Sequence, residues 1–232
     1  MENYEKRLIE ILKTFTLKEI LLLEKQDRQF LALKRLFKKI KDPENFLKLV
    51  VTNALLSYQL QTKGETYWEN FSIYFSQNPN LEAFPIFLKK FNKRLLDAKI
   101  KRLGKILPCI EKVGPLSRCN NLKKFIEEIS KCLKQKEDAK TVVFSAKMLL
   151  YGCRLVKKED ILAPFGIFIP MDSRIQKLNK DKNFWKSIEE KTDIPLLHID
   201  SILWITMGMD EEEIKKLPPT LQKKVQILKT LL

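Results

Sequence analysis

Lys140 lies at the N-terminal end of a predicted helix, where the helix dipole affects the charge of a side chain. Lys140 lies in EDAKTVVFSAKMLLYG, residues 137–152, and the apolar spacing predicts a helix that begins at Ala139 with Asp138 as its N-cap. The positive end of a helix dipole disfavours a cation, so this position favours a neutral, nucleophilic amine. Lys140 is therefore a candidate nucleophile, and an indifferent surface lysine is the alternative.

An aspartate stands at a second helix start, in IFIPMDSRIQKL. Pro170 ends an extended apolar segment, and Asp172 is placed as the N-cap of a helix that begins at Ser173. Hydrogen bonds from helix N–H groups favour the charged form of a carboxylate. Capping alone would explain Asp172, but together the two helix starts offer an amine nucleophile and a fixed anion.

Two helix faces combine aromatic and charged side chains. At about 100° per residue, one face of the first helix carries Lys140, Phe144, Lys147 and Tyr151. The opposite face is aliphatic and is expected to be core, so the first face contacts something else. A ring between two lysines suits a stacked base with phosphates nearby, and a solvated face is the alternative.

The second such face lies in LLHIDSILWITM. Asp200 and Trp204 are one turn apart on this predicted helix, as on the wall of a polar cleft. The alternatives are a core tryptophan and a surface aspartate.

Composition points to a polyanionic partner. The 232 residues suit one domain or two lobes, and 44 Lys and Arg against 29 Asp and Glu give a net charge of +15. Nucleic acid is favoured over a membrane surface as that partner. The chain also lacks the apolar region of a secretory signal and any apolar run of membrane-spanning length. A thermophile's charged surface would explain the abundance of charge but not its sign. We expect a soluble, cytoplasmic protein.

Cysteine and histidine usage limits the chemistry. The four cysteines, Cys109, Cys119, Cys132 and Cys153, show no close C-x-x-C pairing, and His198 is the one histidine. We therefore expect no zinc site, no disulfide framework and no histidine-based catalysis. Lysine and carboxylates must then carry any reaction, without metal or cofactor.

Helical periodicity runs through almost the whole chain, which predicts an all-α protein. The expected helices are 3–14, 17–40, 44–62, 65–77, 81–112, 120–135, 139–156, 173–178, 182–191, 195–208 and 218–231. FGIFIP is the one extended, apolar connection.

Four motifs in order carry a family resemblance. They are SYQLQTKGETYW, DAKTVVFSAKM, IPMDSRI and HIDSILW, spread from Ser57 to Trp204. The chain resembles the helix-hairpin-helix DNA glycosylases, and more narrowly the archaeal-type 8-oxoguanine DNA glycosylase family. One departure is KCLKQKEDAK before Lys140, which has no glycine where the wider superfamily has a Gly-rich hairpin that holds phosphate.

The resemblance implies a two-lobed helix-hairpin-helix fold with its active site in the interlobe cleft. One lobe would join residues 1–62 to 151–232, and the central lobe, 63–150, would carry the divergent hairpin. It also implies a bifunctional base-excision repair enzyme, an N-glycosylase and AP lyase that excises 8-oxoguanine. Lys140 would form a Schiff base with the sugar, and Asp172 would stabilise its positive charge.

The resemblance also implies the contacts with DNA. For the flipped base these are Phe144, Trp204, Lys147, Asp200, Trp68 and Gln29. The alternatives are that Trp68 is a core residue and that Gln29 is a surface residue. For the DNA backbone they are Arg118, Lys134, Lys136 and Arg174, with solvated charges as the alternative.

The expected partner is double-stranded DNA with oxidised guanine, or single-stranded DNA, bound by a monomer at the nucleoid of a prokaryotic cell. Two rival hypotheses remain. One is a non-enzymatic all-α DNA-binding protein, and the other is a glycosylase of the same superfamily for another base, such as thymine glycol or uracil.

Overall fold

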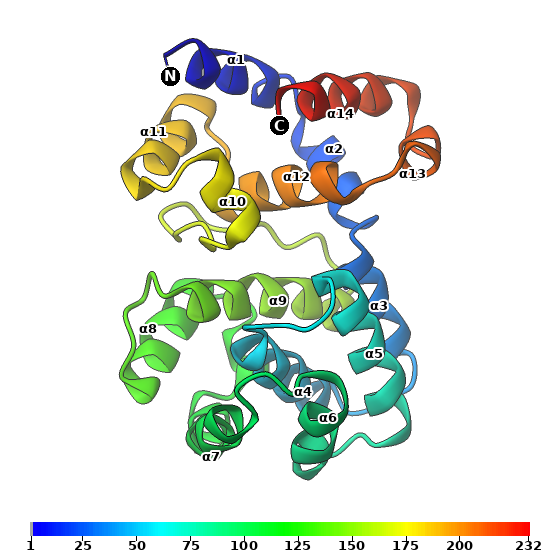
Figure 1. The fold of residues 1–232 in the computed structure, drawn as a ribbon, viewed down its shortest axis with the longest axis vertical. Coiled ribbons are helices and arrows are strands. Elements are labelled where there is room, and N and C mark those ends of the chain that lie inside the picture. The colour runs from blue at the N-terminus through cyan, green and yellow to red at the C-terminus, as the bar shows by residue number, and fades with distance from the viewer. Residues whose placement is uncertain (1) are drawn as a thin grey trace. The chain divides into compact units, whose positions relative to one another are not determined.

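The computed structural model describes residues 2–232, and in that part of the chain the regular secondary structure is helical and no strand occurs (Figure 1). The predicted all-α class is confirmed. The α-helices are α1 (Glu2–Leu12), α2 (Leu17–Glu24), α3 (Arg28–Phe37), α4 (Pro43–Leu56), α5 (Gly64–Gln77), α6 (Phe84–Phe91), α7 (Leu96–Val113), α8 (Leu122–Leu133), α9 (Lys140–Lys157), α10 (Ser173–Leu178), α11 (Lys182–Thr192), α12 (Leu196–Gly208), α13 (Glu211–Lys215) and α14 (Pro219–Leu231). Two short 3₁₀ helices are η1 (Leu81–Ala83) and η2 (Pro115–Arg118). Within the described range, no helix has the length and apolarity that a membrane span requires.

The chain forms two compact units. Unit 1 joins the described residues up to Asp27 to Ala163–Leu232, and unit 2 is Arg28–Leu162. The predicted boundaries at residues 62 and 150 do not coincide with these limits. Two packing facts explain the difference. Within unit 2, α3 packs against α5 and α9, and α4 packs against α9. Helix α9 also continues unbroken through residue 150.

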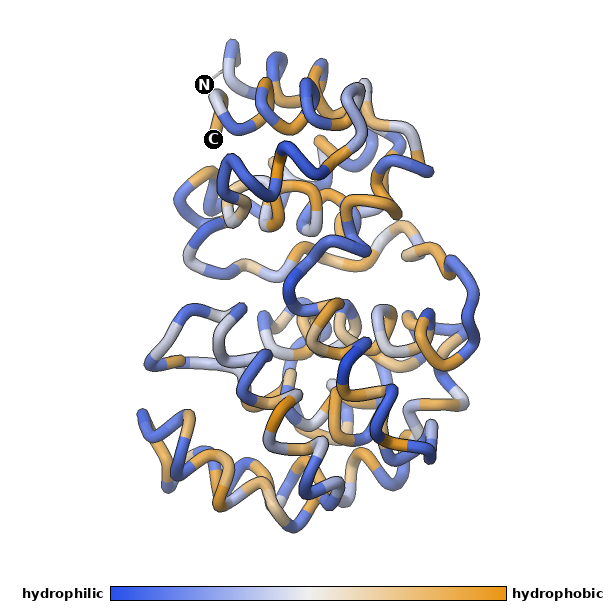
Figure 2. Tube along the Cα trace, turned by 90° about the vertical axis from the view of Figure 1, so that its right-hand side faces the viewer, coloured by the Kyte–Doolittle hydropathy of each residue, from blue (hydrophilic) through white to orange (hydrophobic). Residues whose placement is uncertain are grey.

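Unit 2 is built around the contact between α4 and α9. Hydrophobic and hydrophilic stretches alternate along the helical trace (Figure 2). In α4 the buried positions include the polar Thr52 and Asn53 as well as apolar residues. Gly152 on α9 permits the close approach, because a Cβ atom there would lie 2.6 Å from Cδ2 of Leu47 on α4. The predicted aliphatic face of α9, which includes Val142, Val143 and Ala146, is fully buried.

Unit 1 has its own hydrophobic core. Near the start of the chain, α1 supplies Leu8 and Leu12, and near its end α14 supplies Val225 and Leu228, all fully buried. The two helices pack together, and α12 packs against both α2 and α14. The core of unit 1 therefore combines segments from opposite ends of the sequence.

Two disulfide bonds contradict the expectation that the cysteines would stay unpaired. Cys109 of α7 is joined to Cys132 of α8, and Cys119 after η2 is joined to Cys153 of α9, with Cα–Cα distances of 5.8 and 5.4 Å. Both distances suit a disulfide. The expectation was wrong because it considered only close pairs in sequence, whereas helix packing in unit 2 brings together cysteines 23 and 34 residues apart.

Removing the first disulfide is expected to destabilise the protein. In Cys109→Ala/Cys132→Ala the free energy of unfolding should fall by about 3 kcal/mol, because the bond closes a loop of 23 residues in the unfolded chain. Urea unfolding with and without reductant measures this, and a variant lacking all four cysteines should not respond to reductant. Equal urea midpoints for oxidised and reduced wild type would contradict the prediction.

Several predicted helices are interrupted in the structure. The helix expected over 17–40 is divided by a turn that begins at Lys25, and the one expected over 81–112 is divided before Leu96. In the second case Leu95 has φ 55°, a left-handed conformation that no apolar periodicity reveals. The short helix α13 was not predicted, whereas α10 has the predicted bounds.

Candidate active site

Lys140 is the first residue of α9 and its side chain is exposed. The N-cap is Ala139, which has extended backbone angles and no side-chain acceptor, so the prediction of Asp138 as the cap was wrong by one residue. An Asp just before an apolar run is a common N-cap signal, and this signal led to the prediction of Asp138. The helix begins one residue later than the signal indicates. In the structure the lysine stands even closer to the helix start than predicted.

The face of α9 that carries Lys140 becomes more buried toward the C-terminal end of the helix. Phe144 is half-buried, Lys147 is 1% exposed and Tyr151 is fully buried. The Lys147 amine lies 5.7 Å from the centroid of the Tyr151 ring. The alternative of a solvated face is therefore wrong beyond the first turn.

Aromatic packing in unit 2 supports Phe144. Trp68 of α5 is fully buried and meets the Phe144 ring edge-on, with centroids 6.0 Å apart. This fits the core alternative for Trp68, and direct contact with a base stays a prediction. Gln29 of α3 is 2% exposed, so its alternative as a surface residue is wrong.

The connection between α8 and α9 turns without glycine. Lys134 ends α8 with φ 52°, the left-handed conformation that glycine usually takes after a helix. The N–H of Lys134 donates to the carbonyl of Lys131, and the N–H of Gln135 donates to that of Ser130 at 2.8 Å. Lys134 and Lys136 are both exposed, so their charges are available to solvent.

Asp172 is the N-cap of α10, as predicted. Its Oδ1 atom accepts hydrogen bonds from the N–H groups of Arg174 and Ile175, each at 2.9 Å. The side chain is half-buried and Ile175 is fully buried. The carboxylate is thus fixed in position by the first turn of the helix.

Buried polar groups hold the extended segment that leads to this cap. The N–H of Ala163 donates to Nε2 of His198 at 3.1 Å, and Nδ1 of His198 lies 2.9 Å from the Glu24 carboxylate. Since Nε2 accepts from Ala163, Nδ1 is the ring nitrogen placed to donate to Glu24. Further along, the N–H of Gly166 donates to the Glu189 carboxylate at 3.4 Å. No local pattern in the sequence points to Glu24 or Glu189, whereas the position of His198 in an apolar run favours a buried side chain.

Trp204 of α12 is half-buried and covered by a guanidinium. The Arg174 group lies 3.7 Å from the ring centroid, and its Nη1 donates to the Trp204 carbonyl at 3.4 Å. Asp200, one turn earlier, is 4% exposed, so its alternative as a surface aspartate is wrong. Trp204 is half-buried and packs against the hydrophobic core of unit 1, which fits the core alternative in part.

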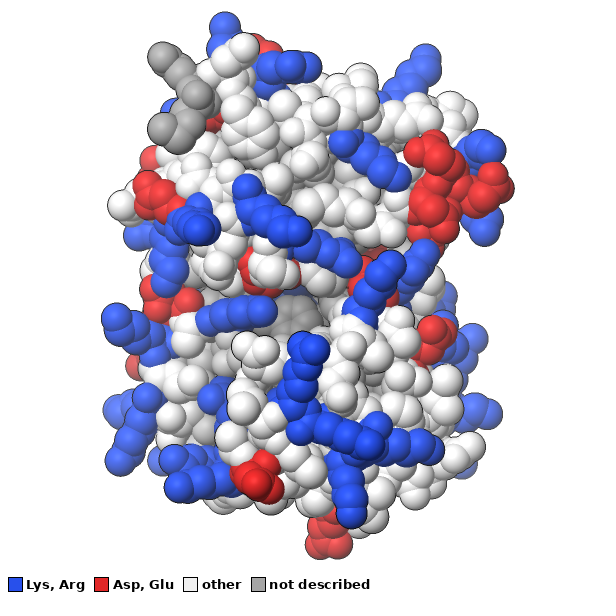
Figure 3. Space-filling model, viewed as in Figure 1, with Lys and Arg blue, Asp and Glu red and all other residues white. Residues whose placement is uncertain are grey.

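Positive charge is spread over the faces of both units seen in Figure 3, and acidic side chains gather where α13 lies. Arg118 is paired with Glu128, with nitrogen–oxygen distances of 2.6 and 3.0 Å. This ion pair raises the pKa of the Arg118 guanidinium and lowers the pKa of the Glu128 carboxyl. The charge of Arg118 is therefore partly compensated.

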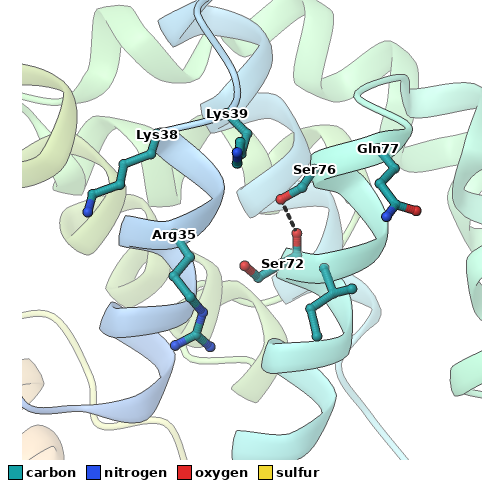
Figure 4. Close-up of a pocket in the computed structure, with 7 residues that line it drawn as sticks. Arg35, Lys38, Lys39, Ser72, Ser76 and Gln77 are labelled. Atoms are coloured by element: carbon teal, nitrogen blue, oxygen red, sulfur yellow. Dashed lines mark hydrogen bonds between the residues drawn. The ribbon is translucent and has the colours of Figure 1, made fainter.

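A concave surface of about 500 Å³ lies between α3 and α5 in unit 2 (Figure 4). Its lining is Arg35, Lys38, Lys39, Ser72, Ile73, Ser76 and Gln77. The Ser76 hydroxyl donates to the Ser72 carbonyl within the same helix. None of the predicted site residues lines this surface.

Comparison with known proteins decides the family. A family model described as "AGOG: N-glycosylase/DNA lyase" matches residues 9–231. The chain belongs to the AGOG family. The resemblance seen in the four motifs is thereby confirmed, and AGOG membership implies that the protein binds DNA.

Relatives and a solved structure agree with AGOG membership. The N-glycosylase/DNA lyase of Methanococcus maripaludis is 42% identical over 201 residues, 80% of each chain, and that of Thermococcus kodakarensis is 40% identical over 216 residues, 86% of this chain and 82% of the relative. The fold matches the crystal structure of 8-oxoguanosine-complexed Pa-AGOG, the 8-oxoguanine DNA glycosylase from Pyrobaculum aerophilum. That match has a TM-score of 0.83 and 26% identity, and covers 98% of this chain and 97% of the other.

Proposed function

We propose that this AGOG protein is a DNA repair N-glycosylase and AP lyase that excises 8-oxoguanine through a covalent intermediate on Lys140. The observation that carries the proposal is the exposed amine of Lys140 at the first position of α9, in a chain of the N-glycosylase/DNA lyase family. The substrate follows from the solved relative, which holds 8-oxoguanosine.

The proposed reaction begins with a nucleotide flipped out of the duplex. The neutral Lys140 amine attacks C1′ of the sugar, and the bond between C1′ and the base breaks with its electron pair leaving on the base, which takes up a proton. The amine nitrogen then passes a proton to the ring oxygen as the bond from C1′ to that oxygen opens, and a protonated imine forms. Asp172, anchored by two N–H groups, stabilises the positive charge that develops on the sugar.

Strand cleavage follows from the imine. The imine makes the hydrogen at C2′ acidic, and loss of this proton pushes out the phosphate at C3′ by β-elimination. Water later hydrolyses the imine and releases Lys140 as the free amine. Every step uses groups of the substrate, water and two protein side chains.

Base recognition is proposed to combine stacking and hydrogen bonding. The stacking candidates are Phe144, which contacts Trp68, and Trp204, from which the Arg174 guanidinium would have to move. The polar candidates are Lys147, Asp200 and Gln29, all buried. Oxidation at C8 converts N7 of guanine from an acceptor to an N–H donor. An acceptor aimed at N7 would leave normal guanine with an unpaired contact, which disfavours it.

For the DNA backbone we propose Lys134 and Lys136 ahead of Arg118, whose charge is compensated by Glu128. Arg174 stays a prediction, with its guanidinium on Trp204 in the DNA-free protein. We further propose double-stranded DNA as the substrate, a monomeric enzyme, and action in the cytoplasm at the nucleoid.

Borohydride trapping on matched duplexes tests this function. The duplexes carry one 8-oxoguanine, one thymine glycol, one uracil or no lesion, and borohydride reduces any imine to a stable adduct. We expect an adduct and a strand break with 8-oxoguanine. Binding without adduct or strand break would favour the non-enzymatic protein, against which family membership already argues. Trapping with another lesion alone would favour the other glycosylase.

A further inference from the structure

Arg102 of α7 contacts three segments of unit 2 that are separated in sequence. Its Nε donates to the carbonyl of Leu55 at 3.2 Å, near the end of α4. Its Nη2 donates both to Oε1 of Gln135 and to Oγ1 of Thr141, each at 2.9 Å. The guanidinium carbon also lies 5.6 Å from the centroid of the Tyr58 ring.

The two acceptors shared by Nη2 lie on either side of the nucleophile in sequence. Gln135 belongs to the connection between α8 and α9, and Thr141 directly follows Lys140. This connection has no glycine and turns at the left-handed Lys134. One nitrogen atom of α7 therefore ties the turn to the first residues of α9.

The guanidinium itself is held in place. Arg102 is half-buried, and burial lowers the pKa of its guanidinium below the ordinary arginine value. The planar guanidinium has donors in a fixed geometry, which a lysine ammonium cannot reproduce.

Tyr58 and Lys99 form a support behind Arg102. The amine of the fully buried Lys99 lies 5.0 Å from the Tyr58 ring centroid and donates to Oδ1 of Asn92 and to the carbonyl of Arg94. This gives the SYQLQTKGETYW motif a structural role, because Tyr58, the first of its two tyrosines, lies against both cations.

We propose that Arg102 is a positioning residue for Lys140. It sets the start of α9, and so the reach of the Lys140 amine, through its hydrogen bonds to Gln135 and Thr141. The proposal rests on the proposed function, in which Lys140 is the nucleophile. A misplacement of a reacting group by about 1 Å can cost on the order of 100-fold in rate.

The test compares Arg102→Met and Arg102→Lys with wild type in single-turnover trapping on the 8-oxoguanine duplex. We expect the rate constant at saturating DNA to fall about 10- to 100-fold in both variants, with affinity for an uncleavable abasic duplex kept within about twofold. A purely structural role would lower the trapped amplitude, because less protein is folded, and leave the rate constant unchanged. Lys101→Met, an exposed cation beside Arg102, is the control and should match wild type.

A double-mutant cycle shows whether Arg102 acts through its two partners. Arg102→Met in a Gln135→Leu/Thr141→Val background should slow trapping by less than about threefold. The background variant alone should show slowed trapping, which keeps the test informative if Arg102→Met does not fold.

Two results would overturn the proposal. One is an unchanged trapping rate constant in the Arg102 variants, whether or not their affinity for DNA is lost. The other is an effect of Arg102→Met on this rate constant that is equally large in the Gln135→Leu/Thr141→Val background. Failure of the proposed function gives a different pattern, because wild type itself would then form no adduct.

Discussion

In Lys140→Gln we expect borohydride to trap no covalent adduct on the 8-oxoguanine duplex, and excision to slow by at least about a thousandfold. The amide of glutamine cannot form an imine, and the exposed lysine at the first position of α9 has no replacement in its own turn. Gel separation of the reduced complex and single-turnover base release measure the two effects.

The matched control is Lys131→Gln, which removes one exposed charge from the last turn of α8. It should keep the adduct and the excision rate. A persistent adduct in Lys140→Gln would assign the imine to another amine and refute the proposed role of Lys140.

Asp172→Asn should lose turnover by about 100- to 1,000-fold while DNA binding stays close to wild type. Asparagine is a good N-cap, and its amide oxygen can still accept from the N–H groups of Arg174 and Ile175. The substitution therefore removes the negative charge and keeps the helix start. Single-turnover rates, DNA affinity and far-ultraviolet circular dichroism are the measurements.

Asp181→Asn is the control for the cap itself. Asp181 caps α11 in the same unit by accepting from the N–H of Asn183 at 2.8 Å. This variant should keep both turnover and binding. If Asp172→Asn instead loses helical content and DNA binding together, Asp172 is mainly a structural cap.

Local signals in the sequence predicted the helix starts well. The helix over 173–178 and its Asp172 cap follow from the residues around Pro170, and the structure contains both. The start of α9 differs by one residue, because the pattern cannot show that Ala139 has extended backbone angles. Prediction succeeded where the determining contacts lie within one turn.

Nonlocal contacts explain what the sequence did not reveal. The disulfides depend on how α7, α8 and α9 pack. In the sequence, nothing distinguishes Arg102 from the many other basic residues. Its partners lie 33, 39 and 47 residues away. No periodicity or spacing rule connects positions so far apart.

The discontinuous core of unit 1 has a consequence for synthesis of the protein on the ribosome. Unit 2 can complete its core once residue 162 has emerged, whereas α1 and α2 must wait for α12 and α14. At about 5–20 residues per second this delay is on the order of several seconds. During that time the apolar faces of α1 and α2 lack their final partners and stay open to other contacts.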